Sequence, residues 1–310
     1  MIPAYNEQAV VGRQIACVRA NSPPGLLEIV VVDNCSTDAT VTVAREAGAD
    51  LVVTTPGTIS EVRNFGVSRT GGAVLIFLDA DVFPTPAWGS RIAGVVQKIL
   101  ADPLLITGSW VCIPSKATWI ERYWFKPLQA GSRTHMNGGH LIMSRELFER
   151  LHGFDARLRT GEDFDLSTRA VQQGARLVND ADLVVEHEGY PKTLGEFFRR
   201  EMWHGMGDFA SMPHFFRSRL AIVGVGLLHL LVFSAIAALV LRDVRWLAGA
   251  LLVTLAAGGA AAAIKYRAAD AVTRLVNSGL YCVYLIARGA SLYAALASFR
   301  PKRAAGASRH

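Results

Sequence analysis

Two aspartates, Asp79 and Asp81, follow directly on the apolar run Ala73–Leu78. A continuous apolar run of this kind is typical of a buried strand, and ligands of open α/β sheets bind beyond the carboxyl ends of the strands. Hard divalent cations such as Mg²⁺ and Mn²⁺ prefer oxygen ligands and are commonly held by one or two carboxylates together with substrate phosphates. The Asp-Ala-Asp pattern therefore predicts a site for a divalent cation and a phosphorylated ligand, with a plain acidic turn as the alternative.

The segments that must position this pair alternate between strand-like and helix-like patterns over residues 1–110. Strands are predicted at Leu27–Val32, ending at Asp33, and at Leu51–Val53, in addition to the strand before Asp79. Residues 36–40 offer N-cap residues to a predicted helix that runs to Ala47 and is closed by Gly48. Further helices are predicted over Ile59–Ser68, Pro86–Leu100 and Ser144–Leu151. This alternation favours an α/β fold with a doubly wound, mostly parallel sheet of the Rossmann-like kind.

Three apolar runs follow Arg219 in this 310-residue chain, of which 51% is hydrophobic. Leu220–Leu241 carries no charge and is long enough to cross a bilayer, for which about 20 apolar residues are needed. Trp246–Ile264 is a second uncharged run of marginal length, and Leu275–Ala287, which Arg288 interrupts, predicts a third span or a helix lying in the interface. Buried helices of a soluble core are the alternative. We expect a first domain over residues 1–216 and a membrane domain with a basic tail over residues 217–310.

Basic residues indicate how these runs are oriented. No apolar signal segment opens the chain, so the N-terminal domain is expected to remain cytosolic. Two spans with an in-plane third helix keep the flanking charges on the cytosolic side, whereas three spans would carry the basic tail across. These charges are Arg217, Arg219, Lys265, Arg267, Arg274, Arg300, Lys302 and Arg303. The sequence thus predicts a multi-pass protein of the cell (inner) membrane.

The net charge of +6 at pH 7 suits anionic lipid headgroups and phosphorylated substrates alike. We expect a membrane partner and no nucleic acid. The cysteines show no metal-ligand spacing, and a cytosolic compartment argues against disulfides. They are expected to fill the core: Cys17, Cys35, Cys112 and Cys282.

Five short motifs are spaced along the first two thirds of the chain. They are Pro3-Ala4-Tyr5-Asn6-Glu7, Val32-Asp33-Asn34-Cys35-Ser36-Thr37-Asp38, Arg63-Asn64, Asp79-Ala80-Asp81 and Gly161-Glu162-Asp163. In order and type they resemble the motifs of family 2 glycosyltransferases, which are inverting enzymes of the GT-A fold that use nucleotide sugars. The resemblance covers residues 1 to about 205, and the apolar tail is similar, more loosely, to the tails of members that act on lipid acceptors. It implies a UDP- or GDP-linked donor, a lipid or lipid-linked acceptor, and Mg²⁺ or Mn²⁺.

The resemblance assigns nucleotide binding to Pro3, Tyr5, Glu7, Asp33, Arg63 and Asp79. Tyr5 offers an aromatic face on which a base can stack, and Asp33 can accept hydrogen bonds from the base or the ribose hydroxyls. Arg63 would direct its guanidinium toward the diphosphate or the base, with an ion pair to Glu61 or Asp81 as the alternative. Asp38 contacts the ligand or caps the helix that follows it.

Glycosyl transfer with inversion needs a base on the face opposite the leaving nucleotide. The resemblance assigns this role to Asp163, just before a helix predicted over Phe164–Gln173. Glu162 and Asp165 either orient Asp163 or cap that helix, and Glu162 is also a candidate contact of the transferred sugar or the acceptor.

In the family, the first aspartate of the pair contacts the ribose side and the second holds the metal. By this resemblance Asp79 would contact the ribose side and Asp81 would hold the metal ion, and both are candidate metal ligands. His187 ends a predicted strand where some relatives place a third ligand, although a lone histidine is more often structural. Gly138-Gly139, within Thr134–His140, predicts a loop that permits close backbone approach to the donor sugar.

Arg199-Arg200-Glu201-Met202-Trp203 departs from the Gln-X-X-Arg-Trp signature of the family's processive synthases. Only Trp203, a candidate acceptor contact, is retained, which favours transfer of a single sugar. The alternatives are a short processive synthase and a non-catalytic nucleotide-binding membrane protein. The family usually has several apolar residues before the Pro3 motif, so we also expect a misassigned start codon or a truncated chain.

Overall fold

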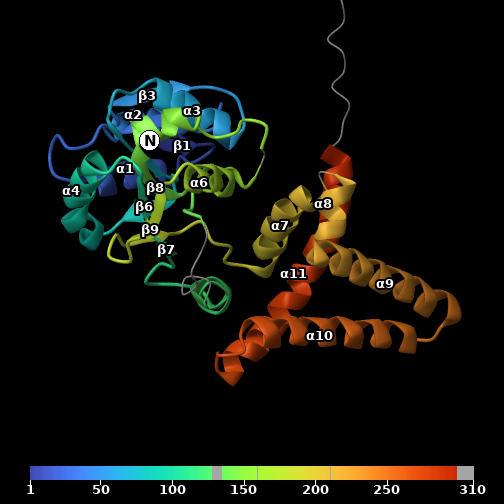
Figure 1. Ribbon diagram of the computed structural model, residues 1–310. Coiled ribbons are helices and arrows are strands. Elements are labelled where there is room, and N and C mark those ends of the chain that lie inside the picture. Colours follow the sequence, from blue (N-terminus) through green and yellow to red (C-terminus); the bar gives the residue numbers. More distant parts are fainter. Residues whose placement is uncertain (128–134, 159, 210, 299–310) are drawn as a thin grey trace, which may run out of the picture. The chain divides into compact units, whose positions relative to one another are not determined.

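The computed structural model describes residues 1–127, 135–158, 160–209 and 211–298 (Figure 1). The chain divides into two compact units, of which the first comprises Met1–Ala117 and Phe125–Tyr190 and the second comprises Thr118–Trp124 and the chain from Pro191 onward. The sequence-based boundary was near Arg217. The structure instead groups α7 (Leu194–Gly205) with the apolar helices, because α7 packs along α11 (Ala271–Ser298).

The strands of the first unit are β1 (Ile2–Ala4), β2 (Val30–Asp33), β3 (Leu51–Thr54), β4 (Val74–Leu78), β5 (Val82–Pro84), β6 (Leu105–Gly108), β7 (Val111–Cys112), β8 (His140–Ser144), β9 (Arg176–Asn179) and β10 (Val185–His187). Its helices are α1 (Val11–Ala20), α2 (Thr40–Glu46), α3 (Ile59–Ser68), α4 (Pro86–Ala101), α5 (Arg145–Arg150) and α6 (Glu162–Gln172). The predicted strand from Leu27 begins at Val30. The predicted helix at Phe164 begins at Glu162, since the amide of Asp165 already bonds the carbonyl of Gly161.

These strands form three sheets. The order β1-β2-β3 is parallel throughout, with Ala4 opposite Asp33 and Asp33 opposite Thr54. In the order β4-β8-β6-β9, β8 runs antiparallel to both neighbours, while β6 and β9 are parallel. The third sheet, β5-β10-β7, pairs β10 antiparallel to β5 and parallel to β7. Parallel strands β1, β2 and β3 thus end together, which brings their following loops to one edge.

Helix caps in the sequence account for several of the helix boundaries. The hydroxyl of Thr58 accepts a hydrogen bond from the amide of Glu61, and the Glu61 carboxylate accepts one from the Thr58 amide, so a capping box opens α3. Thr85 caps α4 with its hydroxyl alone, which accepts a hydrogen bond from the amide of Trp88, and Pro86 stands in the first turn. The helix α4 then buries one face at helical spacing, and the buried residues are Trp88, Ile92, Val95 and Ile99.

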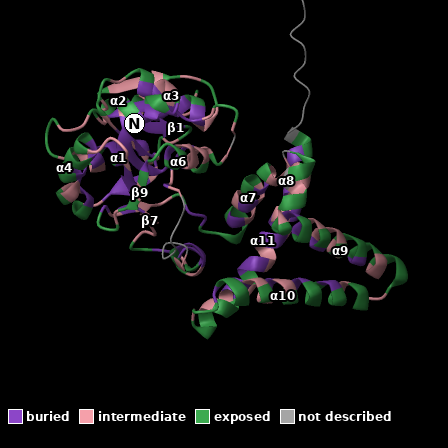
Figure 2. Ribbon diagram, viewed as in Figure 1, coloured by how far each residue is buried: buried purple, intermediate pink, exposed green. Residues whose placement is uncertain are grey.

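The second unit is helical (Figure 1). Besides α7 and α11 it contains η1 (Glu121–Phe125) up to Trp124, η3 (Met206–Phe209), α8 (Met212–Arg217), α9 (Arg219–Leu241) and α10 (Arg245–Lys265). By length and composition α9, α10 and the Ala271–Ala297 part of α11 are long and apolar enough to cross a membrane. Exposed residues run along much of α9 and α10 (Figure 2). The helix α11 continues through Arg288, whose Nε donates to Tyr284 Oη at 3.0 Å and whose Nη1 lies 3.5 Å from Asp208.

Glycines let α11 approach the two preceding helices closely. A Cβ on Gly289 would lie 2.3 Å from the carbonyl oxygen of Gly224, and one on Gly258 would lie 2.5 Å from Cys282 Sγ. Small residues at helix crossings allow this kind of backbone contact in apolar bundles. The contacts place α11 against the first half of α9 and the second half of α10.

Candidate active site

Asp33 is the buried acidic group at the end of β2, with 1% of its surface exposed. Its Oδ2 accepts a hydrogen bond from the amide of Ser36 at 3.1 Å, whereas its Oδ1 is buried without a hydrogen-bond partner among the described residues. A buried acceptor left unpaired costs free energy unless a ligand or water supplies the donor. Tyr5 lies beside it, after β1, with 56% of its surface exposed. The pair offers an aromatic face and a hydrogen-bond acceptor at one edge of the sheet.

The loops after β1 and β2 are joined by Asn6, which the sequence-based assignment did not single out. Its backbone is left-handed, with φ of 56°, its amide donates to Ser36 Oγ at 2.8 Å, and its Oδ1 accepts from the amide of Thr37 at 2.9 Å. Asparagine tolerates this conformation better than most residues. Asp38 accepts hydrogen bonds from the amides of Thr40 and Gln8 in the same loop pair, while the N-cap residue of α2 is Ala39.

Arg63, on α3, is 2% exposed and forms two ion pairs. Its Nη2 lies 2.8 Å from Asp79 Oδ1, and its Nη1 lies 2.7 Å from Glu162 Oε1. The partners anticipated from the sequence, Glu61 and Asp81, are engaged elsewhere, since Glu61 caps α3 and Asp81 contacts a histidine. Arg63 therefore joins the end of β4 to the start of α6.

Asp163 lies in the first turn of α6, where its Oδ2 accepts a hydrogen bond from the amide of Gly138 at 3.0 Å. Gly138 and Gly139 press closely against the other site residues. A Cβ on Gly138 would lie 2.8 Å from Arg63 Nη1, and one on Gly139 would lie 2.8 Å from Asp79 Oδ2. Both glycines therefore lie close to protein groups, and the predicted approach to a donor sugar stays a prediction. Thr134, the first residue of the predicted loop, lies outside the described residues.

Asp81 and His187 lie together, with 3.1 Å between Asp81 Oδ2 and His187 Nε2. The antiparallel register of β5 and β10 sets His187 opposite Val82, the residue after Asp81. Gly189 follows β10 and fits closely here, because a Cβ at this position would come within 1.7 Å of Asp81 Oδ2. The sequence-based assignment missed Gly189. Its position two residues after the candidate ligand His187 was the only signal in the sequence.

Negative charge accumulates around these groups. The pKa of Glu7 is raised to about 7, first by burial and then by repulsion from Asp81, Asp79 and Asp38. A cation bound among the carboxylates would relieve this repulsion. The observation agrees with the charge expected of a site that receives a metal ion together with an anionic ligand.

The donor atoms of Asp81 and His187 fit a divalent cation of this class. An octahedral ion with bonds of about 2.1 Å separates neighbouring ligand atoms by roughly 3 Å, close to the distance found between the two side chains. Within the part of the chain that the structure describes, no three His, Cys, Asp or Glu side chains converge as a complete metal site. An ion held here would complete its shell with water and ligand phosphates, as Mg²⁺ commonly does. Asp79, whose Oδ1 is engaged by Arg63, is less well placed.

His140, the last residue of the glycine loop, is fully buried and forms part of the core. Trp88 Nε1 donates to His140 Nε2 at 3.1 Å, and His140 Nδ1 lies 3.0 Å from Ser109 Oγ. Burial lowers the pKa of His140 to about 3, so the ring is neutral. The candidate acceptor contact Trp203 belongs to α7 in the second unit and is half exposed.

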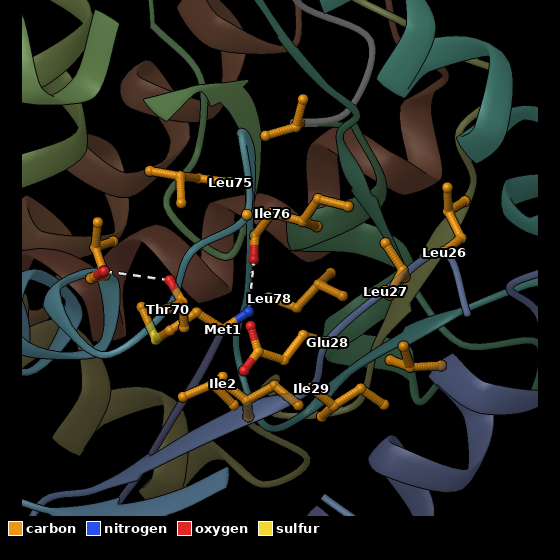
Figure 3. Close-up of a pocket in the computed structure, with 15 residues that line it drawn as sticks. Met1, Ile2, Leu26, Leu27, Glu28, Ile29, Thr70, Leu75, Ile76 and Leu78 are labelled. Carbon is orange, nitrogen blue, oxygen red and sulfur yellow. Dashed lines mark hydrogen bonds between the residues drawn. The ribbon is translucent and has the colours of Figure 1, made fainter. Parts of the chain in front are cut away.

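A pocket elsewhere in the first unit does not compete as a donor site. It lies beside the starts of β1, β2 and β4 and is lined by Ile2, Glu28 and Ile76 among others (Figure 3). Its volume of about 120 Å³ falls below the 300–1,000 Å³ or so typical of small-molecule sites. The carboxylates described above occupy the opposite, carboxyl ends of these strands.

Comparison with protein families matches residues 1–156 to glycosyl transferase family 2 and residues 92–286 to glycosyl transferase family group 2. The glycosyltransferase AglE of Haloferax volcanii is 27% identical over 221 residues, which are 67% of this chain and 71% of AglE. The solved structure of the mannosyltransferase PcManGT from Pyrobaculum calidifontis, in complex with GDP-Man and Mn²⁺, matches with a TM-score of 0.55 and 23% identity, over 94% of this chain and 85% of that protein.

The structural match agrees with the predicted fold, a GT-A α/β domain followed by apolar helices. The first family match covers half of the chain and contains four of the five motifs, namely those of Tyr5, Asp33, Arg63 and Asp79. The chain therefore belongs to glycosyl transferase family 2 and is a glycosyltransferase.

Proposed function

We propose that this enzyme transfers a single sugar, with inversion, from a nucleotide-diphosphate sugar to a lipid or lipid-linked acceptor at the cytosolic face of the membrane. The observation that carries the proposal is the gathering of Asp33, Asp79, Asp81 and Asp163 in one unit, at the ends of β2 and β4 and the start of α6. A protein that only bound nucleotide would have no need to keep Asp79, Asp81 and Asp163, whereas the unpaired acceptor on Asp33 supports the binding of a nucleotide.

For the nucleotide, Tyr5 would stack on the base and Asp33 Oδ1 would accept a hydrogen bond from the base or the ribose. Asp79 would face the ribose side with its Oδ2, since its Oδ1 is held by Arg63. The complex of the mannosyltransferase PcManGT with GDP-Man supports a donor of this class. Pro3 would shape the end of β1 beside Asp33.

Asp81 and His187 would hold Mn²⁺ or Mg²⁺, which would neutralise the leaving diphosphate as a Lewis acid. Asp163 would accept the proton of the acceptor hydroxyl. The acceptor oxygen would form its bond to the anomeric carbon on the face opposite the nucleotide, while the bond from that carbon to the diphosphate oxygen breaks. The hydrogen bond from Gly138 fixes one oxygen of Asp163 and leaves the carboxylate half-buried beside the site.

The membrane arrangement is supported by the contacts of α11 within the second unit. Asn277 Nδ2 donates to the carbonyl of Tyr123 at 2.9 Å, and Ser291 Oγ donates to the carbonyl of Met202 at 2.8 Å. Both partners precede α9 in the chain, so we expect them on the cytosolic side, where α9 would begin its span. Asn277 and Ser291 are roughly 21 Å apart along α11 at about 1.5 Å per residue, so a helix crossing a core of about 30 Å would carry one of them deep into the bilayer. An in-plane α11 with α9 and α10 as spans satisfies both contacts.

A donor-hydrolysis screen tests the function directly. Detergent-purified protein would be incubated with UDP-, GDP- and dTDP-sugars in the presence of Mn²⁺, and release of the nucleoside diphosphate would be measured. We expect one base class to be hydrolysed and the reaction to stop in EDTA. Hydrolysis of none of these donors by folded protein would contradict the proposal.

A further inference from the structure

Both terminal nitrogens of the Arg63 guanidinium form ion pairs with carboxylates. Nη2 lies 2.8 Å from Asp79 and Nη1 lies 2.7 Å from Glu162, while the guanidinium carbon is 5.4 Å from the ring centroid of Phe154. Only 3% of the side chain is exposed. In this position the guanidinium already satisfies two anions and has little surface left for a diphosphate.

The ion pairs of Arg63 and two nearby hydrogen bonds form a closed ring of contacts. Arg63 forms ion pairs with Asp79 and with Glu162. Asp163, which follows Glu162 in the chain, accepts a hydrogen bond from the amide of Gly138 at 3.0 Å. Gly139 follows in the chain, and its carbonyl accepts a hydrogen bond from the amide of Asp79 at 3.2 Å. We name this set the carboxylate ring; its members are Arg63, Asp79, Gly138, Gly139, Glu162 and Asp163.

The carboxylate ring joins four separate pieces of the chain. Arg63 comes from the middle of α3, Asp79 from the end of β4, the glycines from the turn before β8, and the two acidic residues from the start of α6. Among the described residues, no strand ladder joins α3 to α6. The buried ion pairs link the donor-side carboxylate through side chains to the helix that carries the base, beside the hydrogen bonds of Gly138 and Gly139.

We propose that Arg63 is a positioning residue, which holds Asp163 at a fixed distance from Asp79 by bridging Asp79 and Glu162. The inference rests on the proposed function, because it concerns the placement of the base within that site. It assigns Glu162 a role as the anchor of α6 to Arg63, in place of a contact with either sugar.

The choice of arginine follows from the geometry. A planar guanidinium presents parallel donors on two sides and stays charged, so it can bind two carboxylates at once, whereas the ammonium of lysine is a compact point charge. A shift of about 1 Å in a reacting group can lower the rate about 100-fold. Lysine at position 63 would keep the positive charge but would not span both partners.

The first test compares Arg63→Lys, Glu162→Gln and the double variant with Glu146→Gln. Glu146 is a matched control, since it also pairs with an arginine, but on the exposed side of α5. For each protein, kcat for hydrolysis of the donor that the wild type accepts would be measured, together with the affinity for GDP and UDP in Mn²⁺. We expect kcat to fall about 100-fold in Arg63→Lys with nucleotide affinity kept within about threefold. The double variant should be no slower than Arg63→Lys alone, because both changes open the same link.

The second test displaces the guanidinium without changing any charge. In Gly138→Ala the new methyl group would lie 2.8 Å from Arg63 Nη1, whereas in Gly94→Ala, on the exposed face of α4, it would meet nothing within 4 Å. We expect Gly138→Ala to lower kcat with little change in the thermal midpoint, and Gly94→Ala to match the wild type. This variant keeps the proposal testable if Arg63→Lys does not fold.

The outcomes separate this inference from the proposed function. Wild-type protein that hydrolyses no donor contradicts the function itself. An active wild type, combined with folded Arg63→Lys or Gly138→Ala that keeps full kcat, overturns only the positioning role. Loss of GDP and UDP affinity at unchanged kcat would instead show that Arg63 contacts the nucleotide, and additive losses in the double variant would show that Glu162 acts independently of Arg63.

Discussion

His187 Nε2 lies 3.1 Å from Asp81 Oδ2, because the last residue of β10 pairs across an antiparallel ladder with the residue that follows Asp81. The second ring nitrogen of His187, Nδ1, is buried without a hydrogen-bond partner among the described residues. A histidine that binds metal usually anchors its free ring nitrogen through a protein group or a water molecule. The pair has two convergent donor atoms, and the fold rather than the local sequence brings them together.

Replacement of Asp81 by asparagine tests this pair. The amide is a poorer ligand than a carboxylate for a hard cation, so we expect Mn²⁺-dependent GDP or UDP binding to weaken at least about 100-fold, beyond the range seen when supporting groups of a metal site are removed. Isothermal titration with and without Mn²⁺ measures the effect. Equal nucleotide binding by wild type and variant in Mn²⁺ would show that Asp81 is not a ligand.

Substitution of Gly189 by alanine addresses the same pair without removing a donor atom. The added methyl group would lie within 1.7 Å of Asp81 Oδ2 and 3.0 Å of His187 Nε2, so the carboxylate must move. We expect a lower affinity for Mn²⁺ and nucleotide with little loss of thermal stability, since Gly189 is exposed. Gly71→Ala, with open space around it, serves as the control. A Gly189→Ala protein with wild-type Mn²⁺ dependence would mean that the position of Asp81 is not critical.

Asp163→Asn should separate binding from chemistry. The amide keeps the size of the side chain and can still accept the Gly138 hydrogen bond, but it cannot take a proton. General-base catalysis typically contributes about 10²- to 10⁴-fold, so we expect kcat to fall by that factor with donor affinity nearly intact. Single-turnover kinetics with the accepted donor measures both quantities. A variant with wild-type kcat and a raised donor KM would show that another carboxylate is the base.

The sequence predicted the local elements well because their signals are local. Thr58 with Glu61, and Thr85 with Pro86, mark the starts of α3 and α4 within a few residues. The partners of Arg63 were not predictable in this way. Glu61 and Asp81 were near in sequence, but the closure of the chain brings Asp79 and Glu162 to the guanidinium.

In the second unit, too, local composition predicted the helices but not their long-range contacts. Charge-free runs marked α9 and α10 almost to the residue, because a bilayer span is a compositional signal. The apolar run Leu275–Ala287 stops at Arg288, whereas α11 continues to Ser298. Tyr284 and Asp208 satisfy the guanidinium of Arg288, and such long-range partners leave no trace in local composition.

The buried imidazole of His140 predicts a pH dependence of stability. Burial lowers its pKa to about 3 from the ordinary 6.5, so below pH 6.5 the unfolded chain binds a proton that the folded chain does not. Above pH 6.5 the histidine is neutral in both states and does not change the free energy of unfolding. As the pH falls below 6.5, the free energy of unfolding decreases by about 1.4 kcal/mol per pH unit. Urea unfolding of wild type and His140→Gln between pH 6.5 and 4.5 isolates this slope, because Glu7 and the other titrating groups are common to both proteins. Parallel stability curves would contradict the prediction.

The last prediction concerns membrane topology and rests on the contacts of α11. With α9 and α10 as a hairpin and α11 in the plane of the interface, both ends of the membrane domain should face the cytosol, in keeping with the basic residues Arg217, Arg219 and Lys265 at the open side of the hairpin. Fusions of a compartment-specific reporter after His310 and at Asp243 measure this. We expect a cytosolic signal at His310 and an external one at Asp243. A tail found outside the cytosol would establish three spans, and the hydrogen bonds of Asn277 and Ser291 could then not both lie at the cytosolic surface.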